Sequence, residues 1–251
     1  MSGAFAGKVA LVTGSGKNIG RTIALDLARE GASVIVNGRS DRAIVESVVG
    51  EINAAGGQAI VGMADISDEA AVQRMVADAA SAFGGIDILV TNAGLRRQTP
   101  FLEMSLAEWR EILAVALDGA FITAKAVVPH MIKRGGGAIV GLSGISTHVG
   151  TPNRCHVSAS KSGLEGLMRA LAMELAPHDI TCNCVAPGSV DTVRGASAGG
   201  PGGVGLRDRN IPLGRKAAPG EISAAVRYLA GPDGRYVTGQ VLHVNGGLFL
   251  T

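Results

Sequence analysis

Short, almost wholly apolar segments alternate along the chain with longer segments of helical periodicity, and this alternation constrains the fold more than any other feature. Continuous apolar runs indicate parallel strands that are covered on both faces. The runs predict strands at Lys8–Thr13, Ser33–Asn37, Ala59–Gly62, Ile86–Val90, Ala138–Leu142, Ile180–Val185 and Val241–Val244. The segments between them predict helices at Ile19–Glu30, Arg42–Ala55, Glu69–Phe83, Ala107–Lys133, Arg154–Leu175 and Pro219–Leu229.

This order of elements is typical of an α/β fold in which helices cover both faces of a parallel sheet. The sequence therefore predicts a Rossmann-type, doubly wound, seven-stranded parallel sheet. No linker or break in composition divides the chain, and no internal repeat is present. We therefore expect residues 1–251 to form a single domain.

The overall composition narrows the partners and the compartment. A net charge of +2 argues against bulk affinity for nucleic acid or a membrane surface. No apolar run approaches the roughly 18 residues of a membrane span, and Met1–Lys8 lacks the pattern of a signal peptide. Three cysteines, an odd number, favour reduced thiols in the cytoplasm. Cys182 and Cys184 alternate along a predicted strand, so we interpret them as small buried hydrophobes and expect no metal site.

A glycine-rich turn, Thr13–Gly20, stands between a predicted strand and a predicted helix. Glycine lets the backbone approach a pyrophosphate, whose charge then lies at the N-terminus of the helix. Asn18 takes the place of a further glycine, and asparagine tolerates positive φ better than most residues. In this context the turn predicts a dinucleotide-binding domain, and a plain tight turn is the alternative. The expected contacts are Gly14, Ser15, Lys17, Asn18, Ile19 and Gly20.

A second glycine-rich segment, residues 194–205, has no periodicity and follows a predicted strand end. Ordering such a backbone is entropically costly. Its position at the carboxyl edge of the sheet favours a mobile lid over a pocket, spanning about residues 193–217, over a plain surface loop.

Further motifs follow in a fixed order along the chain. They are Asn92-Ala93-Gly94, Cys155–Leu164 with its Lys161, Pro187–Thr192, and Tyr236–Gln240 followed by Asn245-Gly246-Gly247. With the glycine-rich turn, they resemble the short-chain dehydrogenase/reductase family, in its classical form similar to 3-oxoacyl-carrier-protein reductases. The resemblance implies hydride transfer between a nicotinamide cofactor and a carbonyl carbon, and a homotetramer built on the last strand. It also implies cofactor contacts from Asp65, Ile66, Asn92, Ala93, Gly94, Lys161, Pro187, Gly188, Val190 and Thr192.

Two basic residues bear on which dinucleotide binds. Enzymes specific for NAD usually carry an acid at the end of the second strand, for the ribose hydroxyls. Here that position reads Asn37-Gly38-Arg39-Ser40, without an acid. Lys17 and Arg39 together suit a 2′-phosphate through charge-assisted hydrogen bonds. We therefore predict NADP rather than NAD, the alternative being two solvated surface cations.

The same resemblance shows that the proton-transfer residues of the family have no counterparts here. The family's tyrosine precedes its lysine by four residues, which places Val157 at the tyrosine position. Its serine lies thirteen residues before the tyrosine, at Gly144, and its asparagine falls at Ala116. Only Lys161 remains of the four, so the standard proton relay is not expected to operate.

Several nearby residues are candidates for replacement roles. His148 follows the fifth predicted strand, and an imidazole suits proton transfer at neutral pH, although a solvated loop histidine is the alternative. His156 lies five residues from Lys161 and points elsewhere around the helix, so we interpret it as a surface or interface residue. Ser143 and Ser146 are placed to orient a substrate. Basic residues near the predicted pocket, which favour an anionic ligand or form a solvated rim, are Arg96, Arg97, Arg154 and Arg194.

Three functions fit these observations. The first is an NADP-dependent oxidoreductase with a non-standard proton relay, acting on a small carbonyl or alcohol. The second is a non-redox reaction on the same scaffold, assisted by Lys161. The third is a catalytically inactive protein that binds NADP or stabilises a partner, because fold alone does not decide function.

Overall fold

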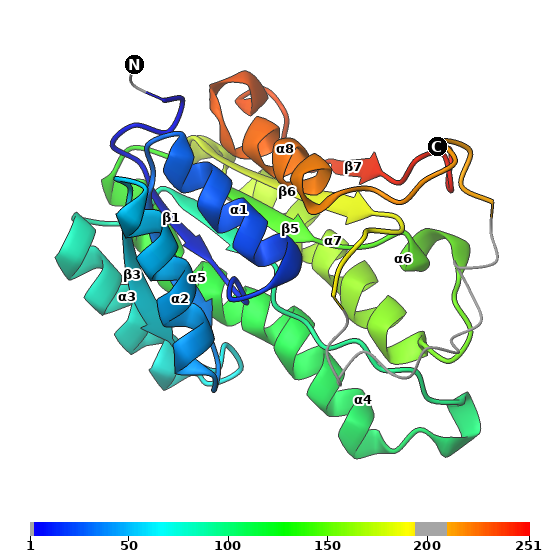
Figure 1. Cartoon of the computed structure of the whole chain (residues 1–251). Coiled ribbons are helices and arrows are strands. Elements are labelled where there is room, and N and C mark those ends of the chain that lie inside the picture. Colours follow the sequence, from blue (N-terminus) through cyan, green and yellow to red (C-terminus); the bar gives the residue numbers. More distant parts are fainter. Residues whose placement is uncertain (1–2, 194–209) are drawn as a thin grey trace.

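One parallel sheet of seven strands organises the chain (Figure 1). The computed structural model describes residues 3–193 and 210–251. The strands lie in the order β3-β2-β1-β4-β5-β6-β7, and every neighbouring pair is parallel. The predicted Rossmann-type fold class is therefore confirmed. The strands are β1 (Val9–Val12), β2 (Ser33–Gly38), β3 (Gln58–Met63), β4 (Ile88–Thr91), β5 (Gly137–Leu142), β6 (Ile180–Pro187) and β7 (Val241–Val244).

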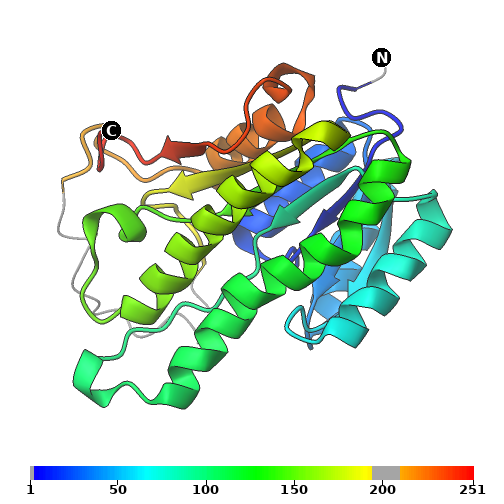
Figure 2. The same ribbon diagram turned by 180° about the vertical axis from the view of Figure 1, so that it is seen from behind.

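Helices cover both faces of this sheet, as Figures 1 and 2 show from opposite sides. One core cluster joins the sheet to α1 (Asn18–Arg29), α2 (Arg42–Ala54) and α8 (Pro219–Ala230). A second joins it to α3 (Glu69–Phe83), α5 (Gly119–Lys133) and α7 (Cys155–Leu175). With apolar side chains packed on both faces, the strands need no polar side, which explains their continuous apolar sequences.

The order of strands fixes where a ligand site forms. Strand β1 pairs with both β2 and β4, so the chain reverses its direction of winding at this point. In doubly wound sheets the crevice beyond the carboxyl ends of the strands at such a reversal is the usual ligand site. The glycine-rich turn after β1 lies at this crevice.

The long predicted helix at Ala107–Lys133 is interrupted in the structure. It consists of α4 (Leu106–Leu113), a π-helical turn η2 (Ala114–Asp118) and α5. Single π-helical turns often occur at functional sites because they shift the side chains that follow them. Gly119, directly after the turn, passes so close to Ile66 that a Cβ there would lie 2.7 Å from the Ile66 Cδ1 atom.

By length and composition alone, Leu106–Lys133 also passes as a membrane-spanning helix, with a mean hydropathy of 1.7. The sequence analysis expected no such run. In the fold α5 packs on α3, β4 and β5, and its side chains Ala120, Val127 and Met131 are buried in the core. A core helix of a globular domain meets the same composition test.

Some features of the fold were not predicted from the sequence. The loop after β5 forms a short helix α6 (Ser146–Val149), and single 3₁₀ turns occur at η1 (Phe101–Glu103), η3 (Ala176–His178) and η5 (Pro232–Gly234). Most of the predicted lid, including Arg194, lies outside the described residues. Its described end is tied to the rest of the fold, since the Leu213 amide donates to the Gly246 carbonyl.

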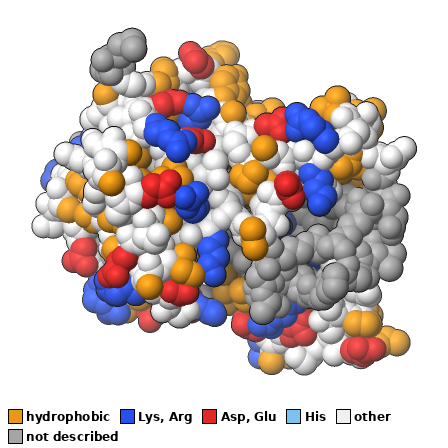
Figure 3. Space-filling model, viewed as in Figure 1, with side chains coloured by type: hydrophobic (Ala, Val, Ile, Leu, Met, Phe, Trp, Pro, Cys, Tyr) orange, Lys and Arg blue, Asp and Glu red, His pale blue; other side chains and the backbone are white. Residues whose placement is uncertain are grey.

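The two cysteines of β6 are buried, and charged side chains of both signs lie on the molecular surface. Cys182 and Cys184 are fully buried on β6, and burial raises the pKa of each thiol to about 12. No cluster of three potential metal ligands occurs within residues 3–193 and 210–251. Figure 3, which shows the face carrying α1, α2 and α8, has acidic and basic side chains interspersed among the coloured residues.

Candidate functional site

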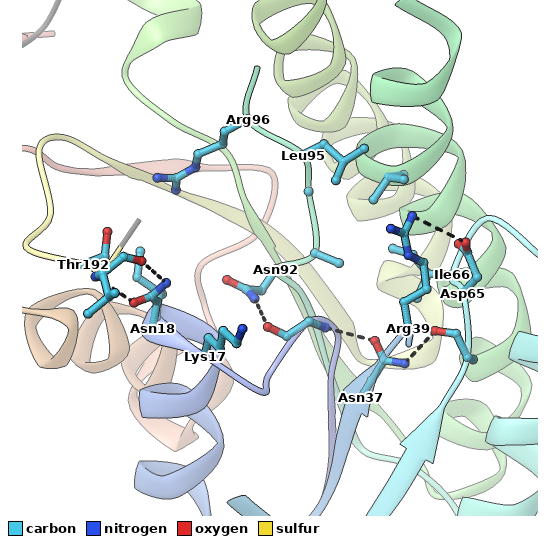
Figure 4. Close-up of a pocket in the computed structure, with 18 residues that line it drawn as sticks. Lys17, Asn18, Asn37, Arg39, Asp65, Ile66, Asn92, Leu95, Arg96 and Thr192 are labelled. Atoms are coloured by element: carbon cyan, nitrogen blue, oxygen red, sulfur yellow. Dashed lines mark hydrogen bonds and ion pairs between the residues drawn. The ribbon is translucent and has the colours of Figure 1, made fainter. Parts of the chain in front are cut away.

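A cavity of about 410 Å³ opens beyond the carboxyl ends of β1, β2 and β4 (Figure 4). It brings together twelve residues that the sequence predicted as cofactor contacts, namely Gly14, Lys17, Asn18, Ile19, Gly20, Arg39, Asp65, Ile66, Asn92, Ala93, Gly94 and Thr192. Its remaining lining comes from Asn37, Ala64, Leu95, Arg96, Val115 and Val193. Of these, Val115 is supplied by the π-helical turn η2.

The glycine-rich turn is held open by two asparagine side chains. The Asn37 Oδ1 atom accepts from the Gly14 amide at 3.0 Å, and the Asn92 Nδ2 atom donates to the Gly14 carbonyl at 3.0 Å (Figure 4). Gly14 itself has φ +61°, and a Cβ there would lie 3.0 Å from the Ala93 Cα atom. The turn therefore needs glycine at this point, both for its backbone conformation and for the close approach.

Asn18 adopts the positive φ that the sequence analysis expected of this position, at 51°. Its side chain also closes a reciprocal pair of hydrogen bonds with the backbone of Val193, at 2.9 and 3.0 Å (Figure 4). A glycine there could not form these bonds. Asn18 thus links the segment after β6, at Val193, to the glycine-rich turn through hydrogen bonds.

Among the described lining residues that sequence reasoning missed, Asn37 is the polar one. In the sequence it stands out only for lacking a negative charge, yet its side chain is buried and donates to the carbonyls of Gly62 and Ala64 as well as accepting from Gly14. The neighbouring Gly38 is equally restricted, since a Cβ there would lie 2.4 Å from the Val45 Cγ2 atom. The signal available in the sequence was an amide at the end of an otherwise apolar strand.

Lys17 and Arg39 stand on opposite sides of the Gly14 turn (Figure 4). The Arg39 guanidinium is half exposed and lies 3.9 Å from the Asp65 carboxylate. Burial alone would raise the pKa of Asp65, but hydrogen bonds from Ser67 and the Arg39 charge outweigh it, so the pKa is lowered. Arg39 is therefore held at the cavity by an ionised carboxylate and retains donors for a further anion.

A second cavity of about 110 Å³ continues from the first, because Ile19, Asn92, Gly94, Leu95 and Arg96 line both. Its wall brings together eight further sequence-predicted positions, namely Ser143, Gly144, Ser146, Arg154, Val157, Lys161, Pro187 and Gly188. The residues predicted to hold a cofactor and those predicted to meet a substrate thus share one continuous cleft.

Lys161 is an ionisable group of the second cavity and lies beside Gly94, which lines both cavities. Its Nζ atom donates to the Leu142 carbonyl, and a Cβ on Gly94 would lie 3.6 Å from it. Burial, and then the Arg96 charge, lower the pKa of the Lys161 ammonium to about 8. One helical turn before it, the side chain facing the same cavity is the aliphatic Val157, with 6% of its surface exposed.

Three predicted positions lie beside the cleft without lining it. Ser15 is buried, and its hydroxyl accepts from the Asn37 amide and donates to the Val12 carbonyl, so it braces the turn. Ala116 is buried in the π-helical turn. Val190 packs against the core and pairs with Ala217 in a parallel bridge.

The structure does not place either candidate histidine in the cleft. The His148 Nε2 atom lies 3.0 Å from the Glu165 carboxylate, and its ring stacks on Phe249. His156, interpreted from the sequence as a surface or interface residue, is fully buried within the chain, with its Nε2 atom 3.1 Å from the Glu108 carboxylate. Helical periodicity gave its direction relative to Lys161, but not the packing of α4 over it.

The arginines of the pocket rim differ in their surroundings. Arg96 and Arg154 line the second cavity. Arg97 is turned to the Glu111 carboxylate, with its Nη2 atom 3.0 Å from one oxygen, and it does not line either cavity. The basic character of the cleft beside Lys161 therefore rests on Arg96 and Arg154.

Comparisons with known proteins agree with this geometry. The family model described as Enoyl-(Acyl carrier protein) reductase matches residues 14–249. The 3-oxoacyl-[acyl-carrier-protein] reductase FabG of Staphylococcus aureus (strain Mu50 / ATCC 700699) is 37% identical over 246 residues, covering 97% of this chain and 98% of that protein. The FabG of Aquifex aeolicus is 38% identical over 246 residues, again with 97% and 98% covered.

Solved structures show the same likeness. A dehydrogenase/reductase from Sinorhizobium meliloti 1021 superposes with a TM-score of 0.88 at 35% identity, covering 98% of this chain and 96% of its own. A 7 alpha-hydroxysteroid dehydrogenase, solved with NADH and 7-oxo glycochenodeoxycholic acid, gives a TM-score of 0.88 at 31% identity, with 97% and 94% covered.

The fold and these matches define a Rossmann-type oxidoreductase scaffold, and one of the similar structures was solved with NADH. The chain belongs to the short-chain dehydrogenase/reductase family, and within it the chain is similar to 3-oxoacyl-carrier-protein reductases. The family resemblance drawn from the sequence is thereby confirmed.

Proposed function

We propose that the protein is an NADP-dependent oxidoreductase that acts on a small carbonyl or alcohol without the family's standard serine–tyrosine–lysine chemistry. The observation that carries this proposal is one continuous cleft that keeps the glycine-rich turn and Lys161 but has Val157 where the family places its tyrosine. Most of the residues expected to bind the cofactor line this cleft. The residues with which the family transfers the proton are replaced by Val157, Gly144 and Ala116.

The residues of the larger cavity fit a dinucleotide. Gly14 and Gly94 line the cavity without a side chain, and the turn leads into the N-terminus of α1, where an anion is favoured. Lys17 and Arg39 supply positive charge for a 2′-phosphate, and Lys161 donates to the nicotinamide ribose. When bound, NADPH supplies the hydride, and the protein orients its ring and excludes water.

The second cavity supports an anionic substrate. Arg96 and Arg154 place two guanidinium groups beside the Lys161 ammonium, and Ser146 adds a hydroxyl to the same wall. A carboxylate or phosphate would be held by charge-assisted hydrogen bonds in this setting. We further propose a homotetrameric, cytoplasmic protein, as the resemblance implies, with no membrane or nucleic-acid partner.

The side chains at the three substituted positions cannot move a proton. Val157 and Ala116 are aliphatic, and Gly144 has no side chain. Alignment of hydride donor and carbonyl would persist, but a positioned general acid typically contributes about 10²–10⁴-fold in rate. The proposed enzyme is therefore expected to be slow on ordinary carbonyls, 3-oxoacyl thioesters included.

The test is an assay of purified protein with NADPH and with NADH across a carbonyl panel, following absorbance at the nicotinamide band and product by mass spectrometry. Consumption of NADPH in step with alcohol formation supports the proposal, and Lys161→Met is the matched inactive control. Product formed without net change in absorbance would instead indicate the non-redox reaction. Tight NADPH binding without any product would indicate a binding subunit.

Cofactor affinity is expected to fall as pH rises through about 8. The pKa of Lys161 is lowered to about 8, so its ammonium predominates below that pH and the neutral amine above it. A bound ribose stabilises the ammonium, which raises its pKa in the complex. Between the two pKa values the affinity should drop by up to about tenfold per pH unit. Fluorescence titration of NADPH from pH 6.5 to 9.5 measures this, and Lys161→Met should remove the dependence.

A further inference from the structure

A buried carboxylate on α7 has no part in the function proposed so far. Glu165 has 5% of its side chain exposed, and it contacts Ser143, which lines the second cavity. Its Oε1 atom accepts from the Ser143 hydroxyl at 2.5 Å and lies 3.0 Å from the His148 Nε2 atom. A third, longer contact comes from the Thr147 hydroxyl at 3.4 Å. Burying a carboxylate costs free energy unless such hydrogen-bond partners compensate it. A buried glutamate with this set of partners therefore suggests a function.

These groups connect the cleft to the surface. Ser143 lines the substrate cavity between Leu142 and Gly144. His148, on α6, has 19% of its side chain exposed and packs on the ring of His243 with centroids 4.6 Å apart. A single carboxylate oxygen thus joins a hydroxyl in the cavity to an imidazole that reaches solvent.

We propose that Ser143, Glu165 and His148 form a proton path that exchanges the proton of the substrate oxygen with solvent. The path takes over the task of the tyrosine that Val157 replaces, and it rests on the oxidoreductase function proposed above. Ser143 is the group that meets the substrate oxygen. Glu165 and His148 act through it as positioning and proton-carrying residues.

The steps balance in both directions. In alcohol oxidation the substrate O–H bond breaks and its proton joins the Ser143 oxygen, while the Ser143 proton moves to the Glu165 carboxylate. The C–H bond breaks at the same time, and its electron pair leaves with the hydride to the oxidised nicotinamide. Glu165 passes its proton to neutral His148, which releases one to water. Carbonyl reduction by NADPH runs the same transfers in reverse.

The order of the three groups argues against a nucleophilic serine. In a catalytic triad the imidazole bonds the serine, so that it can take the proton during attack. Here the Ser143 hydroxyl bonds the Glu165 carboxylate, and the imidazole lies on the far side of that carboxylate. The arrangement suits transfer of a proton through Ser143 and not acyl transfer to it.

The charged and titratable groups around the path come from four elements. Besides His148 on α6, Glu165 faces Arg169 on α7, whose Nη2 atom lies 3.5 Å from its second oxygen, and Cys184 on β6. His243 on β7 packs against His148, and Lys161 lies one helical turn before Glu165 on α7. Burial, and then the His148 charge, lower the pKa of His243, which favours its neutral form.

The experiment compares Glu165→Gln and His148→Ala with the wild type, in kcat, its pH profile and its solvent deuterium isotope effect. Each variant should lower kcat by about 10- to 100-fold, flatten the acidic limb of the profile and leave NADPH affinity unchanged. Added imidazole should restore His148→Ala, a rescue that a merely structural role would not show. Arg169→Gln, which alters only the exposed partner of Glu165, should stay within about twofold of the wild type.

An active wild type whose folded Glu165→Gln variant keeps its rate and isotope effect would overturn the path, and the oxidoreductase proposal would then stand. An inactive wild type would overturn both.

Discussion

Carbonyl reductase activity is expected to rise by about 10²–10⁴-fold when hydroxyls are restored by the double substitution Val157→Tyr and Gly144→Ser. Both positions face the second cavity together with Lys161. A phenol at 157 would lie one helical turn from the Lys161 ammonium, whose charge lowers a phenol pKa and eases proton release. The serine would hold the carbonyl oxygen in place.

The structure leaves space for the Gly144→Ser side chain, whereas Val157→Tyr risks overpacking the second cavity. Among the described residues, the only atom within 4 Å of a Cβ on Gly144 is the Ser146 Oγ, at 3.8 Å, so these residues leave space for a serine side chain. Tyrosine at 157 extends into a cavity of about 110 Å³, and overpacking could cost roughly 1–3 kcal/mol. Thermal unfolding checks this cost separately from activity.

The matched control is Val157→Phe with Gly144→Ala, which adds nearly the same bulk without hydroxyls. Steady-state assays with NADPH and a carbonyl panel should show the gain only for the tyrosine–serine pair. Equal activities in the two double variants would mean that the wild-type cleft is not an ordinary reductase site with its proton donors removed.

NADP affinity is expected to fall by about 10- to 100-fold in Arg39→Asp, the loss of one or two hydrogen bonds to a charged group. The substitution removes a guanidinium from the cavity and adds a carboxylate beside Asp65, whose lowered pKa keeps it ionised. A 2′-phosphate would then lie beside two carboxylates, where it now lies beside a guanidinium paired with one carboxylate. NAD, which lacks this phosphate, should lose far less affinity.

The control is Arg42→Asp, which makes the same change in net charge at an exposed arginine paired with Glu46 and outside the cavity lining. Isothermal titration with NADP and with NAD separates a local effect from a general one. If the two variants weaken NADP equally, or if Arg39→Asp leaves NADP binding intact, then Arg39 is a solvated surface cation.

The sheet could be predicted because burial on both faces leaves a direct mark on the sequence. Strand β1, for example, is apolar throughout, and all four of its residues are buried. The turn that follows could be predicted because positive φ angles favour glycine, as at Gly14. Both signals are local, so no tertiary contact was needed to interpret them.

The missed features depend on contacts between distant segments. The role of Asn37 rests on backbone groups in the turn after β1 and in the strand beside it. Glu165 lies four residues after Lys161 and therefore on the same side of α7, a signal that was present but ambiguous without its partners. The directions of His148 and His156 were set by α6 and α4, and periodicity within α7 could not reveal them.

The crowding beneath Arg39 has a consequence for coenzyme engineering. Exchanging NADP for NAD in such folds usually means installing an acid at the end of the second strand. An acid in place of Asn37 would remove the side-chain amide that donates hydrogen bonds to two backbone carbonyls. An acid in place of Gly38 would collide with Val45. A change of coenzyme would therefore first require redesign of the start of α2. Single substitutions that only weaken NADP binding should give low activity with either coenzyme.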